Sequence, residues 1–268
     1  MNKEKILILD ADSLIYMTAG KDSLEECLTT LEYRIMGIKS VVKCERVIGF
    51  LTSGKCFRYN IDSLYKYKRE VLEKPKFYNT VKNYLIEHHD FIGINGLEAD
   101  DLVSITRDIA NNHNIPNIIA STDKDVLQQI PGKNFDYYIS KESGTFRGFI
   151  NTSEEDSIKF LFKQCLMGDS TDNIEGIKGI GLSKSEVILN KIGDNDFNLN
   201  TFDKYCIKTL NAYKEYYKND VLALKELTKT LRLVYILRNL NDVKQELINI
   251  NTIEYQLNYI IKKLNIEF

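Results

Sequence analysis

Four short acidic motifs stand out in the sequence because each places carboxylates beside an apolar segment. They are Asp10, Glu98-Ala99-Asp100-Asp101, Asp123-Lys124-Asp125 and Asp169-Ser170-Thr171-Asp172. Each motif alone has a simpler explanation, because acidic residues commonly cap helix N-termini. Carboxylates from all four motifs gathered at one site would repel one another strongly unless divalent cations lay between them. The set as a whole therefore favours a metal site.

The chemical type of these residues also predicts the metal. Carboxylates are hard oxygen ligands, which suit Mg²⁺ or Mn²⁺. The five cysteines are scattered and no histidine stands at zinc-ligand spacing, so we expect neither zinc sites nor disulfides. Two ions about 4 Å apart can activate a water and stabilise the leaving oxygen when a phosphodiester is hydrolysed. The motifs thus predict a metal-dependent nuclease that holds two ions.

Alternating strands and helices are expected to position the first three motifs. The apolar run 5–10 predicts a strand buried on both faces, and Asp10 is its last residue. Further strands are predicted at 46–52 and within 115–123, and helices at about 23–40 and 98–112. This alternation indicates an α/β domain with a mostly parallel sheet. Ligands bind beyond the carboxyl ends of such strands, where Asp10 and Asp123 should lie.

The pattern changes beyond Thr152, where it becomes almost wholly helical apart from a strand-like run at Leu233–Leu237. We therefore expect two regions along the chain. Residues 1–152 should form the α/β core, and residues 153–268 should form a helical region that carries the fourth acidic motif.

The acidic motifs resemble those of the 5′ nuclease or flap endonuclease family. The resemblance is carried by Glu98–Asp101, Ser121–Asp125 and Met167–Asn173, which stand in the family's order and spacing. Members include phage ribonuclease H, phage 5′ exonucleases and the nuclease domain of bacterial DNA polymerase I. The resemblance covers about residues 5–190. It implies a PIN-like central sheet flanked by helices, followed by a helical C-terminal region.

The resemblance also implies how the carboxylates share the metal ions. Asp10, Glu98 and Asp100 would hold the catalytic ion. The second cluster would consist of Asp123, Asp125, Asp169 and Asp172, with Asp101 close by. Many relatives carry a further metal-binding Asp just after the second strand, where this chain has no acid up to Thr52. This departure concerns the occupancy of the two metal sites rather than nuclease activity.

A glycine-rich turn predicts contact with duplex nucleic acid. Residues 176–185 resemble the family's helix-turn-helix with an extended turn. Glycines let backbone amides approach a phosphate, and the helix N-terminus that follows adds a favourable dipole, so the duplex backbone rather than the base sequence is bound. The expected DNA-binding residues here are Lys178, Gly179, Gly181, Ser183 and Lys184. The resemblance also implies a K⁺ ion on the carbonyls of the turn, whereas the alternative is an ordinary glycine-rich helix connection.

A segment rich in basic residues lies before the Glu98–Asp101 motif. Between Lys55 and Lys82 there are eight basic residues against three acids, interleaved with Phe and Tyr. Basic groups with aromatics suit single-stranded nucleic acid, although a solvated helix face is the alternative. Tyr65–Arg69 matches the family's motif at the base of a helical arch, here about residues 55–82. By that match Lys66 and Arg69 would contact the scissile phosphate and act in catalysis, with DNA contacts from Arg58, Tyr65 and Lys68.

The overall composition is that of an ordinary globular protein. The chain has 268 residues, of which 43% are hydrophobic, and a net charge of −2. No apolar run approaches the roughly 20 residues that cross a bilayer, and the start does not resemble a signal peptide. We therefore expect no membrane contact and a cytoplasmic location. If a phage encodes the protein, that location would be the cytoplasm of its bacterial host. His88, His89 and His113 are expected at helix ends, in surface or capping roles.

Together these features predict a structure-specific 5′ nuclease with 5′-3′ exonuclease, flap endonuclease and RNase H activity in DNA replication or repair. Expected partners are DNA with 5′ flaps or ends, RNA:DNA hybrids, and replication proteins such as a sliding clamp, a polymerase or a single-strand-binding protein. The tail Leu264–Phe268 could dock the clamp, and the chain should be a monomer. Two alternatives remain open: a DNA-binding module whose catalytic centre has decayed, and a PIN-type nuclease that acts on RNA alone.

Overall fold

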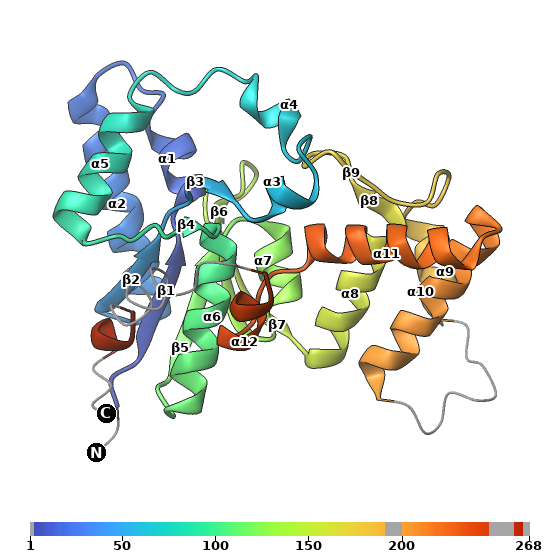
Figure 1. The fold of residues 1–268 in the computed structure, drawn as a ribbon. Coiled ribbons are helices and arrows are strands. Elements are labelled where there is room, and N and C mark those ends of the chain that lie inside the picture. Colours follow the sequence, from blue (N-terminus) through green and yellow to red (C-terminus); the bar gives the residue numbers. More distant parts are fainter. Residues whose placement is uncertain (1–2, 191–199, 247–259, 265–268) are drawn as a thin grey trace. The chain divides into compact units, whose positions relative to one another are not determined.

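The computed structural model describes residues 3–190, 200–246 and 260–264, and these residues form two compact units (Figure 1). Unit 1 comprises Met1–Phe57, Glu73–Thr152 and Ile236–Phe268, and unit 2 comprises Arg58–Leu72 and Ser153–Tyr235. Of the tail Leu264–Phe268, which could dock a clamp, residues 265–268 lie outside the described residues.

Unit 1 is built on a five-stranded sheet in the order β2-β1-β5-β6-β7. The strands are β1 (Ile6–Asp10), β2 (Arg46–Phe50), β5 (Asn117–Ser121), β6 (Gly132–Ile139) and β7 (Phe146–Thr152). The first four run parallel, and β7 pairs antiparallel with β6 at the edge. A short parallel pair, β3 (Ser53–Cys56) and β4 (Asn95–Gly96), lies outside the main sheet. The predicted α/β class with a mostly parallel sheet is therefore confirmed.

Helices cover both faces of this sheet, which explains why the first four residues of β1 are all apolar (Figure 1). The helices of unit 1 are α1 (Asp12–Thr18), α2 (Leu24–Val42), α5 (Tyr78–His89), α6 (Ala99–Asn112), α7 (Lys124–Gln129) and α12 (Leu240–Glu246). Leu7 and Leu9 of β1 belong to a core cluster with α1, α2 and α5. Ile6 and Ile8 alternate to the opposite face and are also fully buried, while α6 packs against β1, β2 and β5.

Local sequence explains where the helices that serve the site begin. The predicted helices at 23–40 and 98–112 correspond to α2 and α6. Ser23 caps α2 by accepting a hydrogen bond from the Glu26 N–H, and Glu98 caps α6 in a reciprocal arrangement with Asp101. His88 and His89 end α5 and His113 ends α6, as predicted.

Unit 2 is almost wholly helical, as predicted for the C-terminal region. Its elements are α3 (Arg58–Ile61), α4 (Tyr67–Glu70), α8 (Glu154–Met167), β8 (Gly168–Asp169), β9 (Ile174–Glu175), α9 (Leu182–Asn190), α10 (Thr201–Tyr217) and α11 (Asp220–Val234). Phe162, Leu189 and Leu227 are buried between these helices, and the Tyr213 hydroxyl donates to the Cys165 carbonyl at 2.7 Å. None of the five cysteines, all of which lie among the described residues, is in a disulfide.

The strand-like run Leu233–Leu237 is not a strand, so that prediction was wrong. Leu233 and Val234 end α11, and the chain continues as an extended connection. In unit 1 the N–H of Ile236 donates to the Gln129 side chain and that of Leu237 to Asp101. The run is apolar because Ile236 and Leu237 are buried, at 2% exposure each.

The unit boundaries differ from the expected division in two segments. One boundary lies between Thr152 and Ser153, whereas residues 58–72 belong to unit 2 and the described residues from Ile236 onward belong to unit 1. Asp62 forms an ion pair with Lys229 at 2.6 Å, and the Lys66 N–H donates to the Asp172 carbonyl, so residues 58–72 are tied to helical partners. Long-range pairing of this kind leaves no trace in local sequence pattern.

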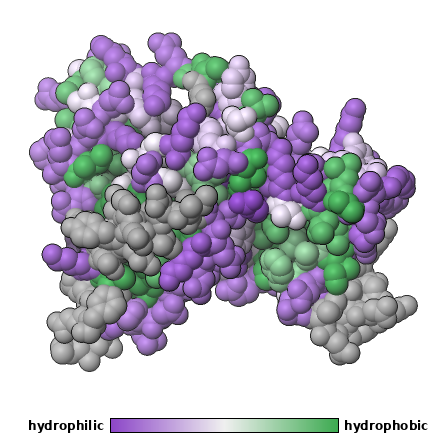
Figure 2. All heavy atoms as spheres, viewed as in Figure 1, coloured by the Kyte–Doolittle hydropathy of each residue, from purple (hydrophilic) through white to green (hydrophobic). Residues whose placement is uncertain are grey.

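The visible surface is mostly hydrophilic, with scattered hydrophobic side chains (Figure 2). Among the described residues, no helix combines the length and apolar character that a membrane span needs.

Candidate metal and nucleic-acid site

The first carboxylate group lies at the carboxyl ends of β1 and β5. The two strands are parallel neighbours, with Leu9 paired to Ala120. The Ser121 hydroxyl donates to the Asp10 carboxylate at 2.6 Å, and the Asp123 N–H donates to the Ser121 oxygen at 2.9 Å. Tyr137 of β6 also stabilises the end of β1, because its hydroxyl donates to the Asp10 carbonyl at 2.7 Å. The fold thus brings Asp10 and Asp123 together, as predicted.

The negative charge of Asp10 is destabilised by its surroundings. Its side chain is only 5% exposed. Burial, the charge of Asp12 and the charge of Asp123 raise the pKa of Asp10 to about 7, against the lowering effect of the Ser121 hydrogen bond. A divalent cation at this position would relieve both the burial penalty and the repulsion.

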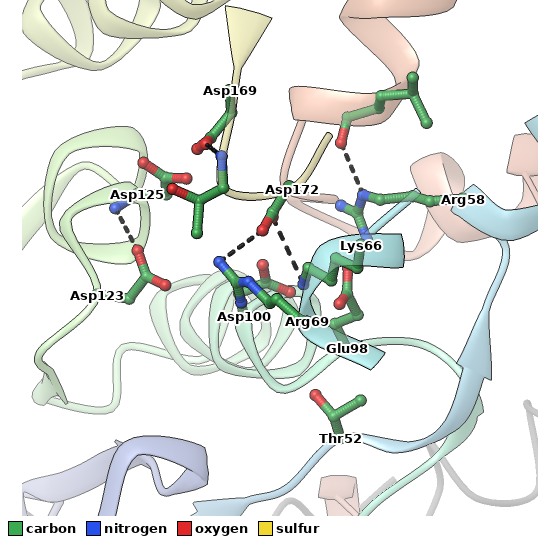
Figure 3. A network of polar contacts seen from close by, with 12 residues as sticks. Thr52, Arg58, Lys66, Arg69, Glu98, Asp100, Asp123, Asp125, Asp169 and Asp172 are labelled. Carbon is green, nitrogen blue, oxygen red and sulfur yellow. Dashed lines mark hydrogen bonds and ion pairs between the residues drawn. The ribbon is translucent and has the colours of Figure 1, made fainter. Parts of the chain in front are cut away.

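The second carboxylate group lies at the start of α6. Glu98, Asp100 and Asp101 offer oxygens that all lie within 4.8 Å of one another. Asp101 is fully buried, and its two oxygens accept from the backbone N–H groups of Glu98 at 3.2 Å and Leu237 at 3.0 Å. Asp101 therefore fixes the start of the helix from which Glu98 and Asp100 project (Figure 3).

Thr52 links these two carboxylate groups. It follows β2, and its N–H donates to an Asp12 carboxylate oxygen at 3.0 Å. Its side-chain oxygen accepts from the Ala99 N–H at 3.0 Å, in the first turn of α6. Both groups therefore lie at one edge of the sheet, and the position where the resemblance implies another acid holds a hydrogen-bonding threonine.

Asp123 and Asp125 lie at the start of α7, next along the same edge (Figure 3). Asp123 is the N-cap, and its side chain accepts from the Asp125 N–H at 2.7 Å. Capping and metal binding are compatible here, since a carboxylate has further lone pairs on its two oxygens.

The fourth acidic motif lies in unit 2, in the loop between α8 and α9. The Asp169 side chain accepts from the Thr171 N–H at 2.8 Å. Asp172 forms ion pairs with Arg69 at 2.5 Å and with Lys66 at 3.6 Å (Figure 3). The two basic residues predicted to contact phosphate thus lie against a predicted metal ligand.

The glycine-rich turn leads directly into α9. Gly179 has φ +83, a left-handed conformation that favours glycine. Lys178, Ser183 and Lys184 are exposed around the turn, as DNA contacts require. The Lys184 ammonium donates to the Gly179 carbonyl at 2.9 Å, so a positive charge already lies at one carbonyl of the turn.

Two predicted DNA contacts are contradicted by burial. Arg58 is 2% exposed and donates to the carbonyls of Leu233 and Tyr235, at 3.0 and 2.6 Å, where α11 ends. Tyr65 is 3% exposed and packs edge-on against Tyr59. Both were predicted from their place in a basic and aromatic segment, but tertiary packing uses them inside unit 2. Lys68 is exposed, with its ammonium donating to the Ser170 carbonyl at 3.2 Å.

The roles of three residues of the site were not predicted from the sequence. Ser121 joins Asp10 to Asp123, Thr52 joins the two carboxylate groups, and Asp12 adds a further charge beside Asp10. Each stands at, or within two residues of, the carboxyl end of a parallel strand, and that position was the available signal. The donor set consists of carboxylate and hydroxyl oxygens, which fits a hard divalent cation.

Comparison with known proteins finds similar proteins among 5′ nucleases. No family model matches the chain. A 5′-3′ exonuclease of Mycoplasma pneumoniae is 30% identical over 173 residues, which are 59% of this chain and 57% of that protein. The flap endonuclease Xni of Pseudoalteromonas translucida is 24% identical over 225 residues, 74% of this chain and 82% of that protein. The chain is therefore similar to proteins named 5′-3′ exonuclease and flap endonuclease. The matched part spans little more than half of the Mycoplasma exonuclease.

The fold of the chain agrees with this similarity. A flap endonuclease of bacteriophage T5, solved in a pseudo-enzyme–product complex with DNA and metal ions, matches with a TM-score of 0.64. The match covers 98% of this chain and 100% of the phage protein at 18% sequence identity, so it is a likeness of fold.

Replacing Asp10 with Asn should stabilise the metal-free protein at pH 8. The Asn oxygen still accepts from Ser121, while the charge that repels Asp12 and Asp123 is removed. Because the pKa of Asp10 is raised from 3.8 to about 7 by folding, the wild type should lose stability as pH rises between these values, and the variant should not. We expect the melting temperature in EDTA to rise by roughly 2–4 °C, which corresponds to about 1 kcal/mol.

The matched control is Asp22→Asn, an exposed position in the same unit. A melting temperature for Asp10→Asn that is lower than wild type, or a difference that does not vary with pH, would contradict a strained carboxylate at this position.

Replacing Arg58 with Met should lower the stability of the protein without lowering its affinity for DNA. The substitution leaves two carbonyls at the end of α11 without their donor, which costs about 2–4 kcal/mol in the free energy of unfolding. Lys68→Met is the matched control, because it should lower DNA affinity and leave stability within about 0.5 kcal/mol. Urea denaturation measures the free energy of unfolding, and fluorescence anisotropy with a duplex DNA measures the affinity. An Arg58→Met variant that is as stable as wild type but binds DNA more weakly would support Arg58 as a DNA contact.

Proposed function

We propose that this protein is a metal-dependent, structure-specific 5′ nuclease that hydrolyses phosphodiesters near 5′ ends and flaps. One observation carries the proposal: Ser121 bonds to both buried Asp10 and Asp123 at the sheet edge. Thr52 in turn bonds to Asp12, two residues after Asp10, and to the Ala99 N–H within the Glu98–Asp101 motif. Such crowding is destabilising without a cation, so it is best explained by a function.

The proposed ligands follow from their places in the fold. Asp10, Glu98 and Asp100 would hold the catalytic ion, Mg²⁺ or Mn²⁺. Such an ion would lower the pKa of a bound water and neutralise phosphate charge when present. Ser121 and Thr52 would keep the carboxylates in position, because each bonds to backbone or side-chain atoms of the groups around it.

The second set of residues would act on the phosphate and a second ion. Asp123, Asp125, Asp169 and Asp172 are the proposed ligands of that ion, with Asp101 as a structural neighbour. Lys66 and Arg69 would stabilise the charge of the scissile phosphate. Their ion pairs with Asp172 keep them close to this motif before substrate arrives.

The glycine-rich turn would bind the backbone of duplex DNA. Lys178, Ser183 and Lys184 are exposed there beside Gly179 and Gly181, and the first N–H groups of α9 follow directly. The phage T5 structure with DNA and metal ions supports DNA as the partner. The Lys184 ammonium at the Gly179 carbonyl could share this turn with a K⁺ ion or serve in its place.

The proposed substrates are DNA with 5′ flaps or ends and the RNA strand of RNA:DNA hybrids, in replication or repair. This role would place the protein, acting as a monomer, with a clamp, a polymerase and a single-strand-binding protein in the cytoplasm. The relatives named 5′-3′ exonuclease and flap endonuclease support the chemistry.

A 5′-labelled flap substrate incubated with Mg²⁺ should be cleaved near the junction. Asp123→Asn should reduce the rate by at least about a hundredfold, because Asn still caps α7 but removes a proposed ligand charge. Asp220→Asn is the control, since Asp220 is exposed on α11. DNA binding without cleavage in Mg²⁺ and Mn²⁺ would indicate a DNA-binding module with a decayed centre.

Lys178→Glu should weaken binding to duplex DNA and reduce the salt dependence of binding by about one counterion. Charge reversal at an exposed lysine of the turn removes a phosphate contact without touching the core. Anisotropy titrations at several salt concentrations measure both effects. Unchanged duplex affinity, together with cleavage of single-stranded RNA, would favour a PIN-type RNA nuclease instead.

A further inference from the structure

Unit 2 contains a groove beside the turn that we propose binds duplex DNA. It has a volume of about 840 Å³ and lies between the glycine-rich turn, α9 and α10. This volume falls within the roughly 300–1,000 Å³ range of ligand pockets and can hold several side chains.

The floor of the groove is apolar. Ile177, Ile180 and Ile188 line it from the turn and α9, and Ile207 and Ala212 line it from α10. Ile207 and Tyr216, both lining residues, remain 44% and 45% exposed. Large apolar side chains left partly exposed around a concavity mark a surface suited to another apolar group.

The rim of the groove is basic. Lys178, Lys184, Lys208 and Lys218 line it, against one acid, Glu215. Two of these ammonium groups are held in place, since Lys184 donates to the Gly179 carbonyl and Lys208 to the Leu189 carbonyl, both at 2.9 Å. An ammonium group has three donors, so each can also bind a carboxylate.

We propose that this groove binds an acidic peptide segment with apolar side chains, supplied by a partner protein. The isoleucine floor would take the apolar side chains and the lysine rim would pair with the carboxylates. A DNA backbone fits less well, because sugars and phosphates offer no apolar side chain for a concave floor.

The same groove would link partner binding to DNA binding. Lys178 and Lys184 belong both to its rim and to the turn that we propose binds the duplex backbone. The peptide and the duplex should therefore compete, an extension that rests on the proposed function. Peptide binding itself does not depend on nuclease activity.

A fluorescein-labelled peptide of alternating Asp and Leu tests the proposal by anisotropy with the full chain. We expect a Kd below about 100 µM, weaker binding at higher salt, and no binding of the matching Lys and Leu peptide. Ile207→Glu and Lys218→Glu should each weaken binding by about tenfold or more, while flap cleavage is unchanged. Leu224→Glu and Lys225→Glu carry the same changes on exposed α11 positions outside the groove and should have no effect.

Several results would overturn the proposal. They are no binding of the acidic peptide, equal binding of the basic peptide, or equal losses for the groove and control variants. If Ile207→Glu weakens duplex binding and the acidic peptide does not bind, the groove belongs to the DNA interface. Asp100→Asn separates the two proposals, because it should abolish cleavage and leave peptide binding intact.

Discussion

Repulsion between carboxylates at the carboxyl edge of the parallel sheet is the constraint on which the rest of the site depends. Asp10 is buried at the end of β1, with Asp12 and Asp123 close enough to raise its pKa. The fold offsets part of this repulsion with oriented donors, namely the Ser121 hydroxyl and the backbone N–H groups at the start of α6 and α7. These donors hold the carboxylates in the arrangement that we propose binds a divalent cation.

In unit 2, basic side chains pair with the acidic motif Asp169–Asp172. Lys66 and Arg69 pair with Asp172, and Lys68 donates to the Ser170 carbonyl in the same loop. The segment 58–72 is thereby tied to the loop between α8 and α9, far from it in sequence. A nucleic acid phosphate or a metal ion at this motif would have to exchange partners with these ion pairs, so substrate and metal binding should depend on each other.

Local sequence signals predicted the parts of the structure that local physics determines. The apolar run ending at Asp10 gave the buried strand, and the acids at Glu98 and Asp123 marked helix starts because N-caps need nearby acceptors. Arg58 and Tyr65 were misread because their partners, the end of α11 and Tyr59, depend on packing. Thr52 and Ser121 escaped notice because their role is to join segments far apart in the chain.

The most direct test of the central claim is a crystal structure with Mn²⁺, using its anomalous scattering to locate the ion. The account predicts an ion in direct contact with Asp10 and with Glu98 or Asp100. Mn²⁺ that binds only at exposed acids elsewhere, with Asp10 contacting no ion, would contradict it.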